Sequence, residues 1–121
     1  MNTPTHRTPA ECAQEQLDAY NARNIERFAA AYHPNVQLID LASGEVFCNG
    51  IDALRSRYGV LFDSHPSLHC TLVSRIVCPP FVMDEEHVRG LLPDSVVHAV
   101  ATYECNEGLI TRAWFVREAT I

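Results

Sequence analysis

The feature that most constrains the fold is a run of strand-like segments that fills the second half of the chain. Four such segments follow Pro66 in direct succession: LHCTLVSRIV, FVMDEEHVRG, SVVHAVATYEC and LITRAWFVRE. Pro79 and Pro80 separate the first two, and the Asn-Glu-Gly sequence at 106–108 predicts a tight hairpin between the last two. Consecutive strands joined by short turns pair in an antiparallel manner, so this half predicts a four-stranded meander.

The first half of the chain carries helix signals around one small hairpin. Thr8, Pro9 and Glu11 have the pattern of a capping box with proline at the first helical position. Asn24 can cap a second helix, which Pro34 ends. Helices are therefore predicted within 5–23, over 25–32 and over 51–65, and short strands over 36–41 and 45–49.

Helices followed by strands predict an α+β fold in a single domain. The 121 residues are one domain by length, spanning 1–121, with residues 1–7 expected to be a flexible N-terminus. We expect about three helices from the N-terminal half to pack on one face of a curved antiparallel sheet. Such a sheet, covered on one side by helices, forms a cone with a cavity between the two layers.

Composition and charge argue against several kinds of partner. The formal net charge is −6, whereas binding to nucleic acid requires a cationic surface. No window of 18 apolar residues exists that could span a membrane, and the first 16 residues lack the apolar core of a secretory signal. The five cysteines form no CxxC pair, which is typical of free thiols in a reducing compartment. We therefore expect a cytoplasmic protein without nucleic-acid or membrane partners.

One carboxylate stands out in the segment VQLID. Val36 and Leu38 share one face of the predicted strand, and Asp40 is the next residue on that face. Asp40 can begin the turn that follows, with its side chain bonded to local backbone N–H groups. Alternatively, this face lines a cavity and Asp40 points into it.

Two clusters of metal-ligating residue types do not predict a metal site. In the DEEH sequence at 84–87, Asp84 and Glu86 fall on one strand face while Glu85 and His87 fall on the other, and we expect this segment to be a solvated strand end. The pair of histidines in HPSLH at 65–69 is interrupted by a proline that ends the helix. The sequence also lacks a glycine-rich phosphate loop and a nucleophile elbow, so no metal or cofactor is expected.

Two long strings resemble the nuclear transport factor 2-like superfamily, and within it the ketosteroid isomerases and SnoaL-like proteins. They are LDAYNARNIERFAAAYHPNVQLIDLASGEVFCNGIDALRSRY and HAVATYECNEGLITRAWF, which together cover about half of the chain. The resemblance implies a cystatin-like roll, which is a cone-shaped curved sheet packed against helices. This fold hosts enzymes, binding modules and transport adaptors, so it does not by itself imply an activity.

The resemblance also implies site residues on the N-terminal half. The general base of ketosteroid isomerases falls without a gap on Asp40, which would remove a proton next to a carbonyl group. The family's oxyanion-hole tyrosine matches Gln16, and Tyr20 lies one helical turn further along the same face. Tyr32 and Tyr58 have the spacing of helical core aromatics, with hydroxyl groups that can reach the rim of a cavity.

The family's second oxyanion donor is a protonated aspartate on the next-to-last strand, and here the match is poor. Val100 occupies that position, and His98 and Glu104 share its strand parity. The face of 96–104 that points inward is left open, because the following hairpin is one residue shorter than in the family. Trp114 and Phe115 occupy opposite faces of the last strand, so one of them lines the cavity.

The function that these residues favour is proton transfer in a small enzyme that resembles ketosteroid isomerase. It binds an apolar carbonyl-containing small molecule, Asp40 acts as general base, and Gln16, Tyr20 or His98 stabilises the enolate. Two alternatives stay open: a non-catalytic ligand-binding or dimerisation module, and a SnoaL-like cyclase or hydrolase. A homodimer is expected, because a four-stranded sheet with helices on one face leaves its other face to be covered.

Overall fold

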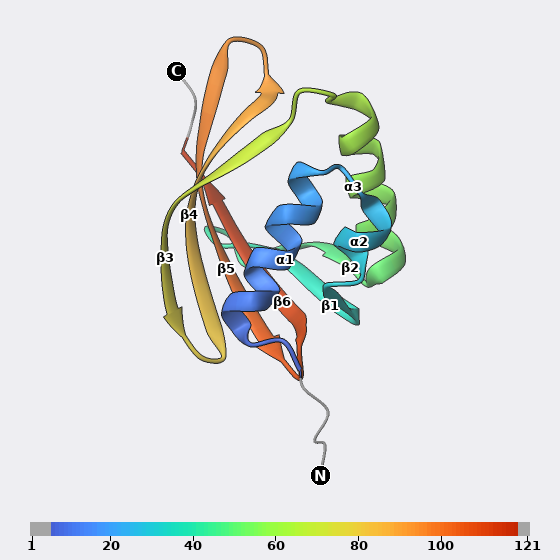
Figure 1. Ribbon diagram of the computed structural model, residues 1–121, viewed down its shortest axis with the longest axis vertical. Coiled ribbons are helices and arrows are strands. Elements are labelled where there is room, and N and C mark those ends of the chain that lie inside the picture. The colour runs from blue at the N-terminus through green and yellow to red at the C-terminus, as the bar shows by residue number, and fades with distance from the viewer. Residues whose placement is uncertain (1–5, 119–121) are drawn as a thin grey trace.

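The computed structural model describes residues 6–118, which form three helices and one sheet of six strands. Helices cover one side of the sheet, as predicted (Figure 1). The elements are α1 (Pro9–Asn21), α2 (Ile25–Ala29), β1 (Tyr32–Asp40), β2 (Val46–Asn49), α3 (Ile51–Ser64), β3 (His69–Cys78), β4 (Phe81–Leu92), β5 (Ser95–Asn106) and β6 (Leu109–Arg117).

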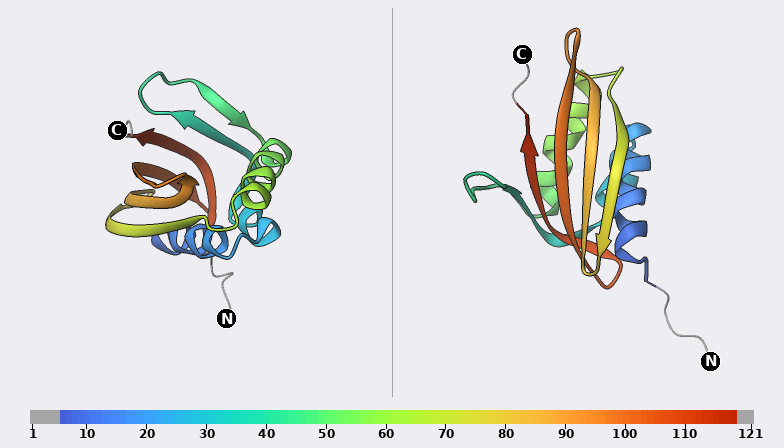
Figure 2. Two further views of the ribbon diagram at one scale, coloured as in Figure 1. Left: turned by 90° about the horizontal axis from the view of Figure 1, so that it is seen from above. Right: turned by 90° about the vertical axis from the view of Figure 1, so that its left-hand side faces the viewer.

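The sheet is mixed rather than wholly antiparallel. Its strand order is β2-β1-β6-β5-β4-β3, and the predicted meander of β3 to β6 pairs antiparallel throughout. β1 joins this meander by pairing in parallel with β6, so the first strand lies beside the last. The sheet curls around the helices without closing, which produces the expected cone (Figure 2).

The helix starts follow the local sequence signals. The Thr8 side chain accepts a hydrogen bond from the Glu11 backbone N–H, and the Glu11 side chain accepts one from the Thr8 N–H. The Asn24 side chain accepts from the Arg27 N–H at the start of α2. Each cap satisfies backbone donors that have no partner within the first helical turn.

The second helix is shorter than predicted and the first strand is longer. α2 ends at Ala29, and Tyr32 already belongs to β1, where it pairs with Ile110 of β6. The Ile110 backbone N–H donates to the Ala31 carbonyl over 2.9 Å. Pairing with a distant strand therefore takes residues that the local pattern assigned to a helix.

The main core lies between the helices and the concave face of the sheet. Its largest fully buried side chains are Tyr103, Phe28, Leu38, Leu54, Leu68 and Ile110. Phe28 is the centre of an aromatic cluster, with ring centroids 4.7–6.1 Å from those of four neighbours on α1, β1 and α3. These rings pack the three helices against one another and against β1.

The predicted flexible N-terminus lies mostly outside the described residues. Within the described part, Arg7 donates from its guanidinium to the backbone carbonyls of Gly108 and Ala30. These two bonds attach the start of the domain to the β5–β6 hairpin and to the end of α2. No helix within residues 6–118 has the length and apolar character needed to cross a bilayer.

Candidate functional site

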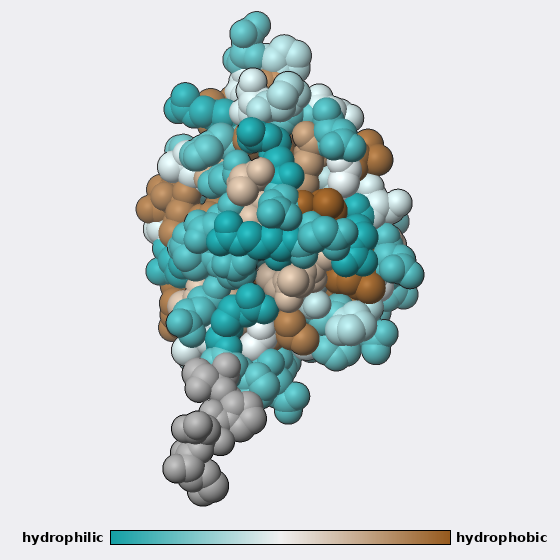
Figure 3. Space-filling view, turned by 45° about the vertical axis from the view of Figure 1, so that its right-hand side comes forward, coloured by the Kyte–Doolittle hydropathy of each residue, from teal (hydrophilic) through white to brown (hydrophobic). Residues whose placement is uncertain are grey.

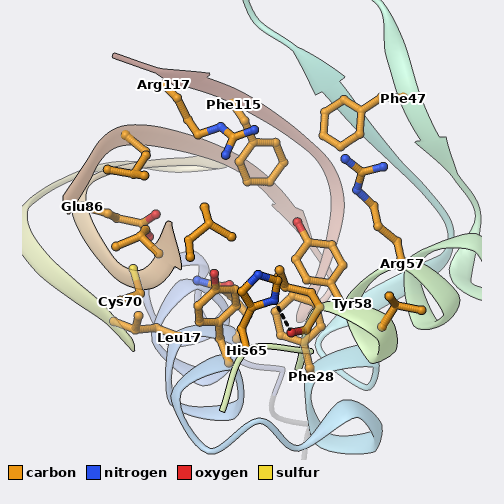
Figure 4. A pocket seen from close by; sticks show the side chains of 18 of the residues that line it. Leu17, Phe28, Phe47, Arg57, Tyr58, His65, Cys70, Glu86, Phe115 and Arg117 are labelled. Carbon is orange, nitrogen blue, oxygen red and sulfur yellow. Dashed lines mark hydrogen bonds between the residues drawn. The ribbon is translucent and has the colours of Figure 1, made fainter. Parts of the chain in front are cut away.

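A cavity of about 380 Å³ lies between the helices and the concave face of the sheet. This volume lies within the range of roughly 300–1,000 Å³ that is typical of small-molecule sites. Aromatic side chains dominate its wall: Tyr20, Phe28 and Tyr58 on the helical side, and Phe47, Tyr103 and Phe115 on the sheet. Figure 4 shows Glu86 on the side of the cavity opposite Arg57 and Phe47.

Glu86 is a carboxylate that β4 places in this apolar wall. Val82, Asp84, Glu86 and Val88 alternate onto the inner face of the strand, and Glu86 is only 8% exposed. Burial, reinforced by the negative charge of Asp84, raises the pKa of Glu86 to about 7. The Cys70 thiol on β3 hydrogen-bonds to this carboxylate, and that contact opposes part of the rise in pKa.

Asp84 has a partner that Glu86 lacks. The Arg75 guanidinium donates to both Asp84 carboxylate oxygens over 2.7 and 2.9 Å, and Asp84 is fully buried. Arg75 also donates to the Gln14 side-chain carbonyl on α1 over 3.0 Å. In the described part of the chain no arginine makes an ion pair with Glu86, so its charged form is compensated much less than that of Asp84.

Three of the predicted donors do line the cavity. Tyr20 and Gln16 come from α1, and Tyr58 comes from α3. Burial raises the pKa of Tyr58 to about 12 and that of Tyr20 further, so both hydroxyls stay protonated and able to donate. The Gln16 amide already donates to the Ala13 carbonyl over 3.0 Å, which leaves one of its two N–H groups for a ligand.

The comparisons with known proteins agree with this architecture. The family model described as SnoaL-like domain matches residues 13–113. The chain belongs to the SnoaL-like domain family. A search of curated proteins finds no match.

Three solved structures illustrate how similar the SnoaL-like fold is across distant sequences. A cystatin-fold protein from Novosphingobium aromaticivorans has 23% identity and a TM-score of 0.83, covering 92% of this chain and 99% of that one. A candidate ketosteroid isomerase from Kribbella flavida has 21% identity and a TM-score of 0.72, with coverages of 89% and 76%. A candidate SnoaL-like polyketide cyclase from Shewanella denitrificans has 11% identity and a TM-score of 0.74, with coverages of 91% and 90%. At these identities the likeness shows the fold alone.

In this SnoaL-like domain Asp40 does not line the cavity. It lies on the expected strand face, because its partner in β6 is the inward-facing Phe115. However, Asp40 is not among the residues that line the cavity, and its side chain accepts hydrogen bonds from the Ser43 N–H and hydroxyl over 3.0 and 2.6 Å. These bonds hold the pKa of Asp40 below its usual value. The turn interpretation of Asp40 therefore describes its position, and the expectation that it faces the cavity is corrected.

His98, Val100 and Trp114 lie on the outer face of the sheet rather than in the cavity. The residues of β5 that line the cavity are odd-numbered: Val97, Ala99 and Tyr103. His98 instead lies between Glu118 and Glu85, 2.8 Å from an oxygen of each, and the two carboxylates raise its pKa. Trp114 packs against Phe81 on the same outer face, and Phe115 is the member of that pair that lines the cavity. The expected ligand contacts of His98, Val100 and Trp114 are therefore corrected.

The sequence held a signal for the inward face of β5. Positions 97, 99, 101, 103 and 105 are all apolar or tyrosine, whereas the alternate positions include His98, Thr102 and Glu104. The same alternation in β4 places Asp84 and Glu86 on one face of the strand together with Val82 and Val88. The expectation that the DEEH segment is a solvated strand end is wrong, because β4 continues through it to Leu92. Within residues 6–118 no group of three or more His, Cys, Asp or Glu side chains could hold a metal ion.

Proposed function

We propose that this SnoaL-like protein binds an apolar carbonyl-containing small molecule in the cone-shaped cavity and transfers a proton with Glu86. The single observation that carries this proposal is a buried carboxylate in an aromatic wall, with its pKa raised to about 7. A base is most effective when its pKa lies near the working pH, because it is then both partly ionised and able to return the proton. Glu86 meets this condition and Asp40, whose pKa is lowered, does not.

The proposed reaction moves one proton within one substrate. Ionised Glu86 removes a proton from the carbon next to the carbonyl group, and the electron pair moves onto the carbonyl oxygen to form an enolate. Hydroxyl groups of Tyr20 and Tyr58, with the second N–H of Gln16, supply donors for that oxygen. Protonated Glu86 then returns the proton to another carbon of the enolate. This sequence neither oxidises nor reduces the substrate, so it requires no cofactor.

Exchange of substrate protons with solvent tests the base directly. We expect the protein to catalyse deuterium incorporation next to the carbonyl of 2-tetralone in D2O, followed by NMR. Glu86→Gln should lower this rate by roughly 100-fold or more, the usual contribution of a positioned base. Glu85→Gln, which changes the neighbouring carboxylate on the outer face, is the matched control and should keep the rate.

Asp40→Asn decides between the two carboxylates. The family resemblance assigns the base to Asp40, and the position of Glu86 favours Glu86. If Asp40→Asn abolishes exchange while Glu86→Gln retains it, the assignment to Glu86 is wrong. Titration with equilenin, a phenolic mimic of an enolate, adds an independent measurement: its affinity should vary with pH around 7 in the unmodified protein and lose that dependence in Glu86→Gln.

A ligand-binding module without catalysis is the second candidate. The engagement of the Gln16 amide by Ala13 favours it, because a donor that is already bonded stabilises an enolate less well. Binding of equilenin without any proton exchange would select this function. A cyclase or hydrolase that uses the same carboxylate is the third possibility, and two solved structures of similar fold carry a cyclase description.

We also propose that the protein forms a homodimer through the outer face of the sheet. One cross-strand row of that face consists of Ile76, Met83, Thr102 and Trp114, one residue from each of β3 to β6. The side over the helices is mainly hydrophilic with isolated apolar residues (Figure 3). The apolar row therefore favours the sheet as the contact surface.

A cytoplasmic location is part of the same proposal. All five cysteines are free, and four of them are buried as small apolar side chains. Free buried thiols fit a reducing compartment.

A further inference from the structure

Two arginines at the cavity have no carboxylate partner in the described part of the chain. Arg57 comes from α3 and Arg117 from the end of β6, and both line the cavity. Figure 4 shows them on the side of Phe47 and Phe115, with the Arg57 guanidinium carbon 4.7 Å from the centre of the Phe47 ring. By contrast, four other arginines each make an ion pair with a carboxylate: Arg27, Arg55, Arg75 and Arg112.

What distinguishes this arginine pair, Arg57 and Arg117, is its position at one cavity in a protein that is acidic overall. Of the nine arginines, five make no ion pair with a carboxylate within residues 6–118, and Arg57 and Arg117 are the two of these five that line the cavity. Two cations that line one cavity without a partner create a local positive potential, which attracts an anion. The guanidinium group is planar and can donate two parallel hydrogen bonds to a carboxylate.

Tyr58 connects the arginine pair to the rest of the cavity. Its hydroxyl points toward the part of the cavity that lies beside Phe115 and Arg57 (Figure 4). Both arginines act to lower the pKa of Tyr58, against the larger effect of burial, so both lie close enough to influence the hydroxyl. The Tyr58 hydroxyl can therefore act as a further donor to a group that these arginines bind.

The carboxylate of Glu86 and the arginine pair are at separate positions with room between them. Glu86 and Arg117 belong to one inward cross-strand row, and the residue between them is Ala99 on β5. The small side chain of Ala99 leaves space over the middle of the row for a flat apolar body. Arg75, which is already bonded to Asp84, is the arginine that acts on Glu86.

We propose that the ligand of this cavity is an apolar ring compound with a carboxylate at one end, bound by Arg57, Arg117 and the Tyr58 hydroxyl. This inference rests on the proposed function, in which the carbonyl end of the same molecule approaches Glu86. The substrate class is thus a cyclic keto acid rather than a neutral ketone. The arginine pair orients the ligand, because only one end of such a molecule carries charge.

A matched pair of probes tests the inference. We would titrate the protein with 6-hydroxy-2-naphthoate and with its neutral analogue 6-hydroxy-2-naphthamide, following the fluorescence of each. The naphthoate should bind roughly tenfold or more tightly, as expected for a hydrogen bond to a charged group. Raising NaCl from about 50 mM to about 500 mM should weaken binding of the naphthoate and leave the naphthamide unchanged.

Substitutions assign the preference to the arginine pair. Arg57→Gln and Arg117→Gln should each weaken naphthoate binding by roughly tenfold without affecting the naphthamide. Arg57→Lys should keep part of the preference because it keeps the charge. Arg55→Gln is the matched control, since Arg55 lies on the same helix and pairs with Glu26 outside the cavity.

The outcomes separate this inference from the proposed function. Equal affinity for both probes, or equal loss of both in the arginine variants, would overturn the carboxylate assignment while proton exchange by Glu86 could still be measured. Failure of both probes and of equilenin to bind would overturn the proposed function and this inference together. Selective loss of naphthoate binding supports the inference even if Glu86→Gln retains proton exchange.

Discussion

Glu86 is a residue whose ionisation opposes folding. Its pKa is 4.5 in its usual state and about 7 in the folded protein, so between these values the folded state holds a proton that the unfolded state has lost. Stability therefore falls as pH rises from about 4.5 to 7 and stays low above that range. The full penalty is on the order of 3 kcal/mol, at about 1.4 kcal/mol for each pKa unit.

We predict that Glu86→Gln stabilises the protein at pH 8 and much less at pH 5. The gain at pH 8 is on the order of 3 kcal/mol in the free energy of unfolding, because glutamine does not ionise. Urea unfolding at the two pH values measures it. Glu85→Gln is the control: hydrogen bonds from His98 and Ser74 lower the pKa of Glu85, so its loss should not stabilise the protein at pH 8. A gain of the same size for Glu86→Gln at both pH values would contradict the prediction.

The sequence was enough to predict that a carboxylate lies at the cavity, but not which carboxylate it is. A carboxylate following apolar residues on a strand face is visible in the sequence at Asp40, and the same pattern occurs at Glu86. Alternation gives the face of a strand, but it does not say how far along the strand the cavity extends. Asp40 shares an inward row with Phe115, yet its side chain is bonded to Ser43 in the following turn and does not line the cavity. Which of the two carboxylates, Asp40 or Glu86, reaches the cavity depends on the curvature of the whole sheet.

At the scale of elements, Gly90 shows how closely β4 approaches the loop before β3. Gly90 has a φ of 76° within a stretch where the register of β4 against β5 shifts. A Cβ built at this position would lie 2.3 Å from the Ser67 backbone carbonyl oxygen. Backbone atoms cannot move aside as a flexible side chain can, so the site excludes any residue other than glycine.

Comparison with Gly44 makes this a quantitative prediction. Gly44 also has a φ of 76°, but a Cβ there has no neighbour within 4 Å. Gly44→Ala should therefore cost about 1 kcal/mol from backbone conformation alone. Gly90→Ala should cost roughly 3 kcal/mol in total, because the steric conflict is added. Chemical denaturation of both variants measures the difference, and equal losses would show that the loop at Ser67 moves freely.

Elements defined by neighbouring residues were predictable, and elements defined by distant pairing were not. The caps at Thr8 and Asn24 depend on atoms three residues away, and both are formed as predicted. The start of β1 at Tyr32 depends on Ile110, which no local pattern can reveal. The parallel pairing of β1 with β6 converts the predicted antiparallel sheet into a mixed one for the same reason.

At the scale of the whole molecule, the order of helices before strands was enough to predict a cone with a cavity. The residues that form the cavity wall could not be predicted in the same way, because they depend on which face of each strand points to the concave side. The alternation in β5 indicates the inward face, whereas the match to the family's oxyanion position falls on residues of the opposite face. His98, Val100 and Trp114 consequently belong to the outer surface of the sheet and do not line the cavity.

That outer surface carries the prediction of a homodimer. Ile76 is 63% exposed and Met83, its cross-strand partner, is 43% exposed, and Trp114 continues the row on β6. A stable interface buries about 800 Å² of accessible surface on each partner. The row across four strands can form the centre of such an interface. We predict a dimer for the unmodified protein and a monomer for Ile76→Glu, because the substitution buries an unpaired charge in the contact.

Sedimentation equilibrium over a range of concentrations measures this assembly. Leu41→Glu is the matched control, because Leu41 is 51% exposed but lies in the turn after β1, away from the row. It should leave the dimer intact. A monomer for the unmodified protein, or a dimer that survives Ile76→Glu, would place the contact elsewhere and leave the apolar row exposed to solvent. Since the cavity opens on the concave side, loss of the dimer through the convex face should not change the affinity for 6-hydroxy-2-naphthoate.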